Sequence, residues 1–153
     1  MSVSERLKEL GITLPAVAAP VAAYVPAVVH AGTVITSGQL PFVDGALPET
    51  GKVGAGVAPD AAKGYARQCA LNALAAAADA AGGVDRLAGV LRVGAFVASD
   101  PSFTGQPAVA NGASEVLGEI FGEAGRHARA AVGVPVLPLD TPVEVEVTFL
   151  LAE

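Results

Sequence analysis

The chain lacks tryptophan and has only one cysteine, two tyrosines and five phenylalanines among its 153 residues. The single cysteine, Cys69, excludes an internal disulfide and a cysteine-rich metal site. It lies in a helical pattern, and we expect it to fill the core rather than act as a nucleophile. Basic residues are also scarce: the chain has nine of them and fifteen acidic residues, which gives a net charge of −6. An acidic chain without a Lys/Arg cluster is a poor nucleic-acid binder, because phosphate contacts supply most of that affinity.

Standard catalytic and targeting patterns are absent as well. There is no P-loop, no G-x-G-x-x-G that opens a helix after a strand, no H-E-x-x-H, no G-x-S-x-G and no C-x-x-C. The histidines His30 and His127 are far apart and form no metal motif. Residues 1–11 lack the regions of a signal peptide, and prolines break the apolar stretch 14–32, so it does not indicate a membrane span. We therefore expect a soluble cytoplasmic protein without a metal.

What the chain does contain is apolar: 52% of its residues are hydrophobic and its mean hydropathy is +0.54. The length predicts a single domain over residues 1–153, with residues 1–20 as an N-terminal extension. Apolar surface that the core does not use commonly forms an oligomer interface.

Hydrophobic periodicity predicts the element order β-β-α-β-α-β-β, preceded by a short helix. Ala31-Gly32 suits a tight hairpin turn, and Asp60 is the expected N-cap of the first long helix. In the strand 87–99, strict alternation places Val90 on one face with Arg92. Both faces are largely apolar, which predicts a central strand. Two helices on one face of a mixed sheet make an α+β domain, and a partner subunit is expected to cover the other face.

Few charged residues interrupt the apolar runs near the C-terminus. Arg129 opens a strand, where it either makes a surface ion pair or clamps a small carboxylate with its guanidinium fork. Glu144 and Glu146 share one face of the last strand. They either form a solvated face, with ion pairs to Arg92 or Arg129, or supply a general base or water-positioning group.

A second group of candidates comes earlier in the chain. Ser37 and Gly38 end a strand, and a glycine there lets a ligand approach the backbone, although an ordinary turn would need the same residues. Tyr24 either packs in the core or presents its ring and hydroxyl to a ligand.

Four stretches together resemble the RidA/YjgF family of enamine/imine deaminases, once labelled L-PSP endoribonucleases, over roughly residues 24–147. Residues 35–41 match I-T-S-G-Q-[IL]-P, and Gln68 and Asn72 match the helix pattern Q-x-x-x-N. Residues 90–100 match the central strand of the family. Residues 129–138 match R-x-x-V-x-V-x-x-L-P, followed by V-E-[IV]-E at 143–146.

The resemblance implies a chorismate-mutase-like fold, a homotrimer and sites in the clefts between subunits. By position it implies that Arg129 holds the substrate carboxylate and that Glu144 positions or activates water. Ser37 and Gly38 would line the pocket, and Tyr24 would pack over the ligand. The implied reaction is hydrolysis of 2-enamino or 2-imino acids to 2-keto acids and ammonia, and it needs no cofactor because the imine is already electrophilic.

The chain also departs from the family pattern and resembles a divergent branch. Ala131 stands where the archetype has a cysteine, and Asn111, the counterpart of a pocket asparagine, is one residue further from Arg129. Arg126 and His127 either add to the pocket or serve as cations at the end of a helix. A non-catalytic module that binds a small carboxylate or a protein in the same cleft remains an alternative. The acidic charge argues against an RNA-acting protein.

Overall fold

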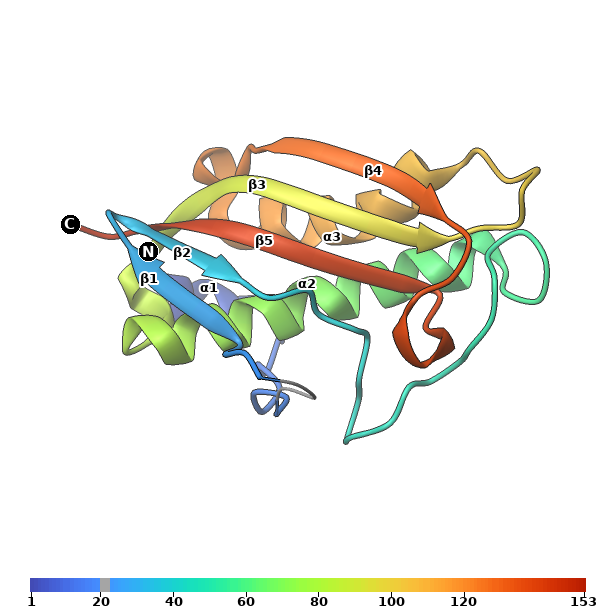
Figure 1. Ribbon diagram of the computed structural model, residues 1–153. Coiled ribbons are helices and arrows are strands. Elements are labelled where there is room, and N and C mark those ends of the chain that lie inside the picture. The colour runs from blue at the N-terminus through green and yellow to red at the C-terminus, as the bar shows by residue number, and fades with distance from the viewer. Residues whose placement is uncertain (20–22) are drawn as a thin grey trace.

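The computed structural model describes residues 1–19 and 23–153 and places the predicted elements in the predicted order (Figure 1). A short helix, α1, precedes them, as expected for the segment 4–10. The elements are α1 (Val3–Glu9), β1 (Ala27–His30), β2 (Thr33–Thr36), α2 (Pro59–Ala81), β3 (Leu87–Ala98), α3 (Gln106–Phe121), β4 (Ala128–Val134) and β5 (Val143–Leu151). Single turns of 3₁₀ helix lie at Val84–Arg86, Gly122–Gly125 and Pro138–Asp140.

The five strands form one mixed sheet in the order β1-β2-β5-β3-β4. The pair β3 and β4 is parallel because α3 crosses over between them, and every other pair is antiparallel. The helices α2 and α3 lie on one side of the sheet (Figure 1). The prediction of an α+β domain with two helices on one face of a mixed sheet is therefore confirmed.

Local residue chemistry explains where several elements begin and end. The β1–β2 hairpin turns at Ala31 and Gly32, whose φ angles of 49° and 77° suit a two-residue turn. Helix α2 begins with Pro59 at a position that needs no N–H donor, and it ends at Gly82 with a φ of 87°. The prediction that Asp60 is the N-cap is wrong, because Ala58 holds that position and Asp60 lies in the first turn.

A β-bulge in β3 changes which residues share a face. Val90 pairs with Phe149 and Arg92 with Thr148, so Leu91 is the extra residue between two pairs. The predicted sharing of one face by Val90 and Arg92 is therefore wrong. Val90 points into the core with Val93, whereas Arg92 points to the opposite face.

The core fills the layer between the sheet and the helices. It is built from small and β-branched side chains, with Phe149 as its largest fully buried residue. Cys69 is fully buried there, as predicted, and burial raises the pKa of its thiol well above the ordinary value. Many alanines in α2 let the helix lie close to the sheet, because they add no bulk between the layers.

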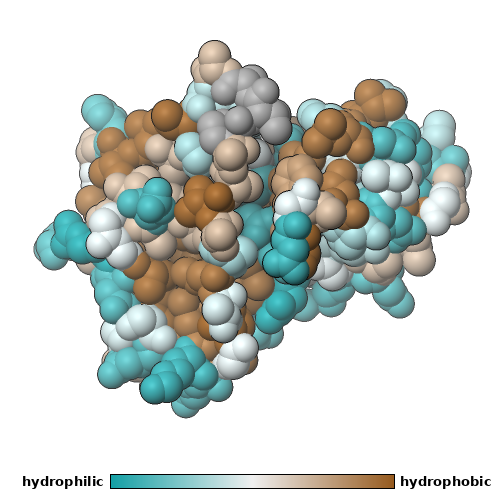
Figure 2. All heavy atoms as spheres, turned by 90° about the horizontal axis from the view of Figure 1, so that it is seen from below, coloured by the Kyte–Doolittle hydropathy of each residue, from teal (hydrophilic) through white to brown (hydrophobic). Residues whose placement is uncertain are grey.

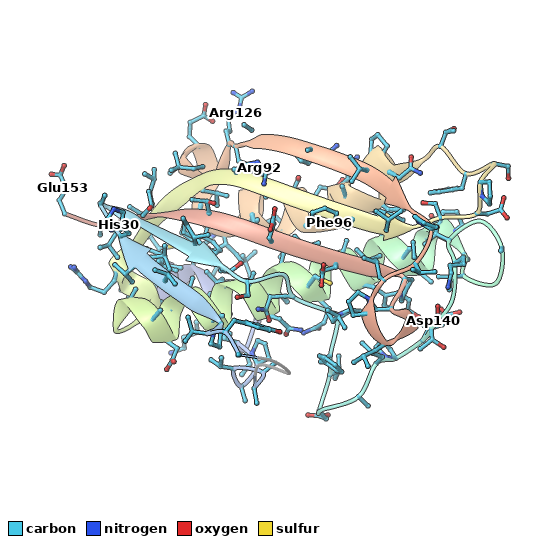
Figure 3. The ribbon with its side chains drawn as sticks, viewed as in Figure 1. His30, Arg92, Phe96, Arg126, Asp140 and Glu153 are labelled. Atoms are coloured by element: carbon cyan, nitrogen blue, oxygen red, sulfur yellow. The ribbon has the colours of Figure 1, made fainter. Side chains whose placement is uncertain are left out.

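The opposite face of the sheet carries a mixture of apolar and charged side chains. Arg92 and Phe96 follow one another along this face of β3 (Figure 3). Exposed large hydrophobic residues on it include Val28, Ile35, Val132 and Leu150. That a partner subunit covers this face stays a prediction.

The N-terminal segment packs on the domain rather than standing apart from it. Ser2 caps α1 in a capping box with Glu5, and Leu7 is buried in the core. Ser4 is bound to the Asp85 carboxylate through both its N–H and its hydroxyl. Among the described helices, none is both long enough and apolar enough to cross a membrane.

Candidate functional site

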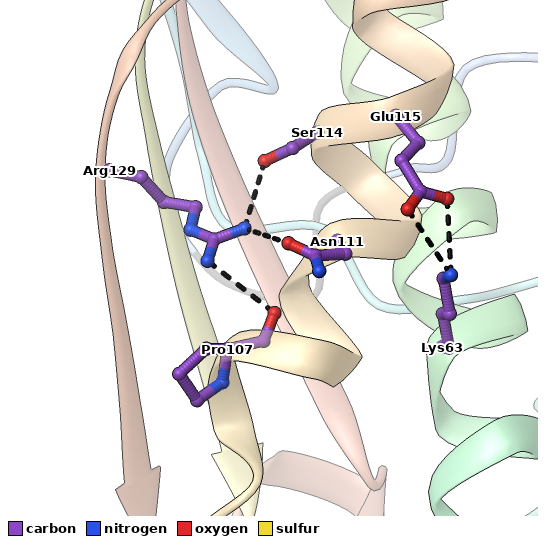
Figure 4. A network of polar contacts seen from close by, with 6 residues as sticks. All are labelled: Lys63, Pro107, Asn111, Ser114, Glu115 and Arg129. Carbon is purple, nitrogen blue, oxygen red and sulfur yellow. Dashed lines mark hydrogen bonds and ion pairs between the residues drawn. The ribbon is translucent and has the colours of Figure 1, made fainter.

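Arg129 lies on edge strand β4 and points toward the helices. It pairs with Val93, a core residue, so its side chain leaves the sheet on the helix side. There its Nη1 donates to Asn111 Oδ1 at 2.8 Å and to Ser114 Oγ at 3.2 Å, and Nη2 donates to the Pro107 carbonyl at 3.4 Å (Figure 4). Helix α3 thus orients the guanidinium through three acceptors on successive turns.

These contacts leave part of the Arg129 guanidinium available. An arginine has five N–H donors, and the three acceptors engage three of them. Within residues 1–19 and 23–153, no carboxylate lies at ion-pair distance from Arg129, although acidic residues outnumber basic ones. The two remaining donors are the number that a bidentate carboxylate takes. This arrangement favours the carboxylate clamp over the surface ion pair.

His127 belongs to the same network through Ser114. His127 Nδ1 donates to the Gly125 carbonyl at 2.6 Å, since a carbonyl oxygen only accepts. Ser114 Oγ and His127 Nε2 lie 2.8 Å apart and share one hydrogen bond, and the same Oγ accepts from Arg129 Nη1. Arg126 is exposed, and its ion pair among the described residues is with Glu123. The sequence gives no sign of Ser114 beyond its position three residues after Asn111, on the same face of α3.

Glu144 lies on the other face of the sheet. It pairs with Phe96 in the register, and its side chain is half-buried. Burial, and then the neighbouring Glu146 carboxylate, raise the pKa of Glu144 above its ordinary value of 4.5. Arg92 pairs with Glu146 at 3.2 Å instead. In the described part of the chain Glu144 has no hydrogen-bond or ion-pair partner, so its carboxylate is available to a ligand or water.

Gly38 packs directly against that carboxylate. A Cβ at this position would lie 2.9 Å from Glu144 Cδ and 3.2 Å from its Oε1. Gln39 exchanges two backbone hydrogen bonds with Val145, at 2.8 and 3.0 Å, and so fixes Gly38 beside β5. A side chain at this position would therefore push the Glu144 carboxylate out of its place.

Ser37 has a structural part in the same region. Its hydroxyl donates to the Val25 carbonyl at 2.6 Å, and its N–H donates to the Pro26 carbonyl at 2.8 Å. These bonds hold the segment that carries Tyr24, which is 45% exposed. Ser37 thus positions the pocket wall, whereas Tyr24 and Gly38 line the pocket itself.

Tyr24, Gly38 and Glu144 line a common cavity of about 160 Å³. Glu144 lies at its wall with Gly38 and Tyr24, and most of the remaining lining is apolar: Ala18, Ala19, Pro26, Leu40, Phe42, Pro138 and Leu139, with Gln39. Figure 2 views the molecule from this side and shows hydrophobic surface around a hollow. Leu139 has a φ of 57°, a left-handed conformation that costs a residue with a Cβ roughly 1–2 kcal/mol.

The family helix pattern at Gln68 and Asn72 holds one wall of this cavity. Asn72 is 6% exposed, and its Nδ2 donates to the carbonyls of Leu40 (2.9 Å) and Phe42 (3.1 Å). Gln68 Nε2 donates to Asn72 Oδ1 at 3.0 Å, which orients the amide. The pattern therefore fixes the loop that follows β2.

Replacing Asn72 with alanine is expected to lower the free energy of unfolding by about 1–3 kcal/mol, because two loop carbonyls lose their donor. Urea unfolding measures the loss. Gln68→Ala is the matched control and should cost less, since the hydrogen bond of Gln68 goes to the Asn72 side chain and not to a loop carbonyl. Equal stability of Asn72→Ala and the unchanged protein would contradict this role.

The candidate residues form two groups within one chain. Arg129 shares the helix-side face with Val93, and Glu144 shares the open face with Phe96. Asn111, Ser114 and His127 surround Arg129, whereas Tyr24 and Gly38 accompany Glu144. Ala131, the departure from the family cysteine, pairs with Ala95 on the helix side, two residues beyond Arg129. One small ligand cannot bridge the two groups through the sheet of a single chain.

Comparison with known proteins identifies related chains. A family model described as YjgF/chorismate_mutase-like, putative endoribonuclease, matches residues 4–153. Protein TCP17 of Trypanosoma cruzi is 45% identical over 145 residues, which cover 94% of this chain and 91% of that protein. The crystal structure of Atu1372, a protein of unknown function from Agrobacterium tumefaciens, has 41% identity and a TM-score of 0.89, with 97% and 92% of the two chains covered. RidA from an Antarctic Psychrobacter has 33% identity and a TM-score of 0.61, with 90% and 95% covered.

Proposed function

This chain belongs to the YjgF/chorismate-mutase-like family, and from that premise we propose that it hydrolyses reactive 2-enamino and 2-imino acids to 2-keto acids and ammonia. The observation that carries the proposal is the half-buried Glu144 carboxylate, which has a raised pKa and no partner among the described residues at the wall of an apolar cavity. A carboxylate in this state suits a general base, because its pKa lies closer to neutral pH than that of an ordinary glutamate.

The second element of the proposal is the carboxylate clamp. Arg129 is oriented by Asn111, Ser114 and the Pro107 carbonyl, and two of its N–H donors remain for a substrate carboxylate. Because Arg129 and Glu144 leave the sheet on opposite faces, we propose that one substrate uses Arg129 of one subunit and Glu144 of another. This division agrees with the homotrimer that the resemblance implies, whose sites lie in clefts between subunits.

The proposed chemistry balances without a cofactor. A 2-enamino acid gains a proton on carbon and becomes the 2-iminium acid. Glu144 takes a proton from water while the water oxygen bonds to the imine carbon, which gives a 2-amino-2-hydroxy acid. Protonated Glu144 then gives its proton to the amino nitrogen, the C–N bond breaks and ammonia leaves, and loss of the hydroxyl proton forms the 2-keto acid. The protein supplies orientation and the base, and binding of the carboxylate holds the imine carbon in place.

A trapping assay tests the proposal. An amino-acid oxidase generates 2-imino acids, and semicarbazide traps whatever imine survives. The protein is expected to lower the yield of semicarbazone and to raise the rate of 2-keto acid release. If no imino acid is consumed while 2-keto acids still bind, the cleft belongs to a non-catalytic carboxylate-binding module, and the deaminase proposal fails.

A further inference from the structure

The turn between β4 and β5 contains an apolar side chain that neither backbone preference nor core packing explains. Leu139 and Asp140 follow one another with φ angles of 57° and 58°. The Leu139 side chain is 61% exposed, so burial within the chain does not offset its strained backbone. Strain of this kind persists where the surrounding structure fixes it, and it commonly marks a functional position.

The surroundings of Leu139 hold the turn in this conformation. Asp140 forms an ion pair with Lys52, and its carbonyl accepts the N–H of Gly51 at 2.9 Å. Thr141, the next residue, is completely buried. Asp140 and Thr141 therefore hold the turn on the C-terminal side of Leu139 (Figure 3 labels Asp140). The Leu139 side chain lies at the wall of the Glu144 cavity.

The chemistry of the cavity indicates what it can hold. Its volume is about 160 Å³, and an apolar protein cavity of roughly 150 Å³ takes a ligand the size of benzene. Among the described residues that line it, the polar side chains are Tyr24, Gln39 and Glu144. The Gln39 amide nitrogen already donates to the Ser37 carbonyl at 3.2 Å. Within the described lining, Glu144 is the one charged residue, and it is already assigned as the base.

The N-terminal segment completes the wall. Ala18 and Ala19 line this cavity, and together with Phe42 they also line an adjoining hollow of about 440 Å³. The segment is held by α1, where Leu7 is buried and Arg6 Nε donates to the Glu119 carbonyl at 2.8 Å. Two alanines at this position leave space that larger side chains would fill.

We propose that the cavity walled by Tyr24, Phe42, Leu139 and the N-terminal alanines is a specificity subsite that selects 2-imino acids with bulky apolar side chains. Leu139 is its specificity-determining residue. The inference rests on the proposed function, since it places the side chain of the same substrate whose imine carbon faces Glu144. It goes further by naming the substrate class: side chains of the size found in leucine, methionine or phenylalanine.

The first arm of the test measures turnover. The 2-imino acids derived from leucine, methionine, alanine and glutamine are compared in the trapping assay. Methionine and glutamine side chains have similar length, so that pair separates polarity from size. We expect kcat/KM to favour the two larger apolar substrates by about tenfold or more. Leu139→Asn, which tolerates the left-handed backbone but removes the apolar group, should abolish most of this preference. Val136→Asn is the matched control, because Val136 is also exposed but does not line the cavity.

The second arm does not depend on catalysis. Binding of 4-methyl-2-oxopentanoate and of pyruvate is measured by calorimetry for the same proteins and for Ala19→Phe, which should fill the cavity from the other side. Weaker binding of the larger acid in both Leu139→Asn and Ala19→Phe supports the subsite, even if no imino acid is turned over and the proposed function fails. If the unchanged protein and Leu139→Asn prefer the larger acid over pyruvate to the same degree, the proposed subsite is overturned. Loss of the oligomer in Leu139→Asn also overturns it, since Leu139 would then be an assembly contact.

Discussion

Replacing Arg129 with alanine is expected to lower kcat/KM for 2-imino acids by roughly 10²- to 10⁴-fold, because two charge-assisted hydrogen bonds to the substrate carboxylate are lost. The fold should survive, since Arg129 lies exposed on an edge strand and its partners Asn111 and Ser114 can be solvated. The trapping assay measures the loss, and thermal unfolding checks the fold.

Two further variants separate the clamp from simple loss of charge. Arg126→Ala removes a nearby exposed arginine whose ion-pair partner is Glu123, and it should leave activity unchanged. Arg129→Lys keeps the charge but loses the planar fork, so its activity should lie between those of the alanine variant and the unchanged protein. Full activity in a folded Arg129→Ala protein would remove Arg129 from the site.

Mixing defective chains tests whether two subunits share each site. Arg129→Ala and Glu144→Gln chains are unfolded together, refolded and assayed. If each site takes Arg129 and Glu144 from different copies, roughly a quarter of the sites in randomly mixed rings have both residues intact. Activity should therefore reappear in the mixture. A mixture that forms mixed oligomers and stays as inactive as its components would place both residues in one chain.

Replacing Glu144 with glutamine is expected to lower kcat by about 10²- to 10⁴-fold, the usual contribution of a general base. Glutamine has nearly the same shape, so it fits against Gly38 as the glutamate does. Substrate binding should change little, because the carboxylate clamp and the apolar cavity remain. Steady-state kinetics in the trapping assay separate the fall in kcat from any change in KM.

Glu146→Gln is the matched control for Glu144→Gln. Glu146 lies on the same face two residues further along β5 and pairs with Arg92 in an exposed ion pair. Its removal should keep most of the activity. Because Glu146 helps to raise the pKa of Glu144, the acidic limb of the pH–activity profile should move to lower pH in this variant. An unchanged limb would mean that another group controls it.

The raised pKa of Glu144 also has a consequence for stability. The folded protein binds the proton of Glu144 more tightly than the unfolded chain does, so the ionised group destabilises the fold once the pH exceeds the folded pKa. This penalty disappears as the pH falls below the ordinary value of 4.5. Glu144→Gln should therefore unfold at a higher temperature than the unchanged protein at neutral pH, and this difference should shrink in acid. A less stable variant at neutral pH would contradict the buried, unpartnered state of the carboxylate.

The sequence alone determined the element order, the fold class and the candidate site residues. Alternation with period two marks β5, and the glycine pair after Ala81 marks the end of α2, because these signals depend only on local geometry. The consecutive motifs at 35–41 and 129–146 indicated the family, and the family model confirms it. Arg129, Glu144 and Gly38 stood out because charge and glycine are informative within apolar strands.

Only the tertiary structure decided how those residues are grouped. Strand register puts Arg129 and Glu144 on opposite faces, and register is set by pairing between strands that are distant in sequence. The bulge at Leu91 shifts which side chains of β3 point to each face of the sheet, and no local sequence pattern predicts it. Ser114 binds Arg129, and Leu139 lines the cavity, only because elements distant in sequence pack together. Hydrophobic periodicity along the chain determines each element. The neighbours of a side chain are determined only by the register and packing of elements that are distant in sequence.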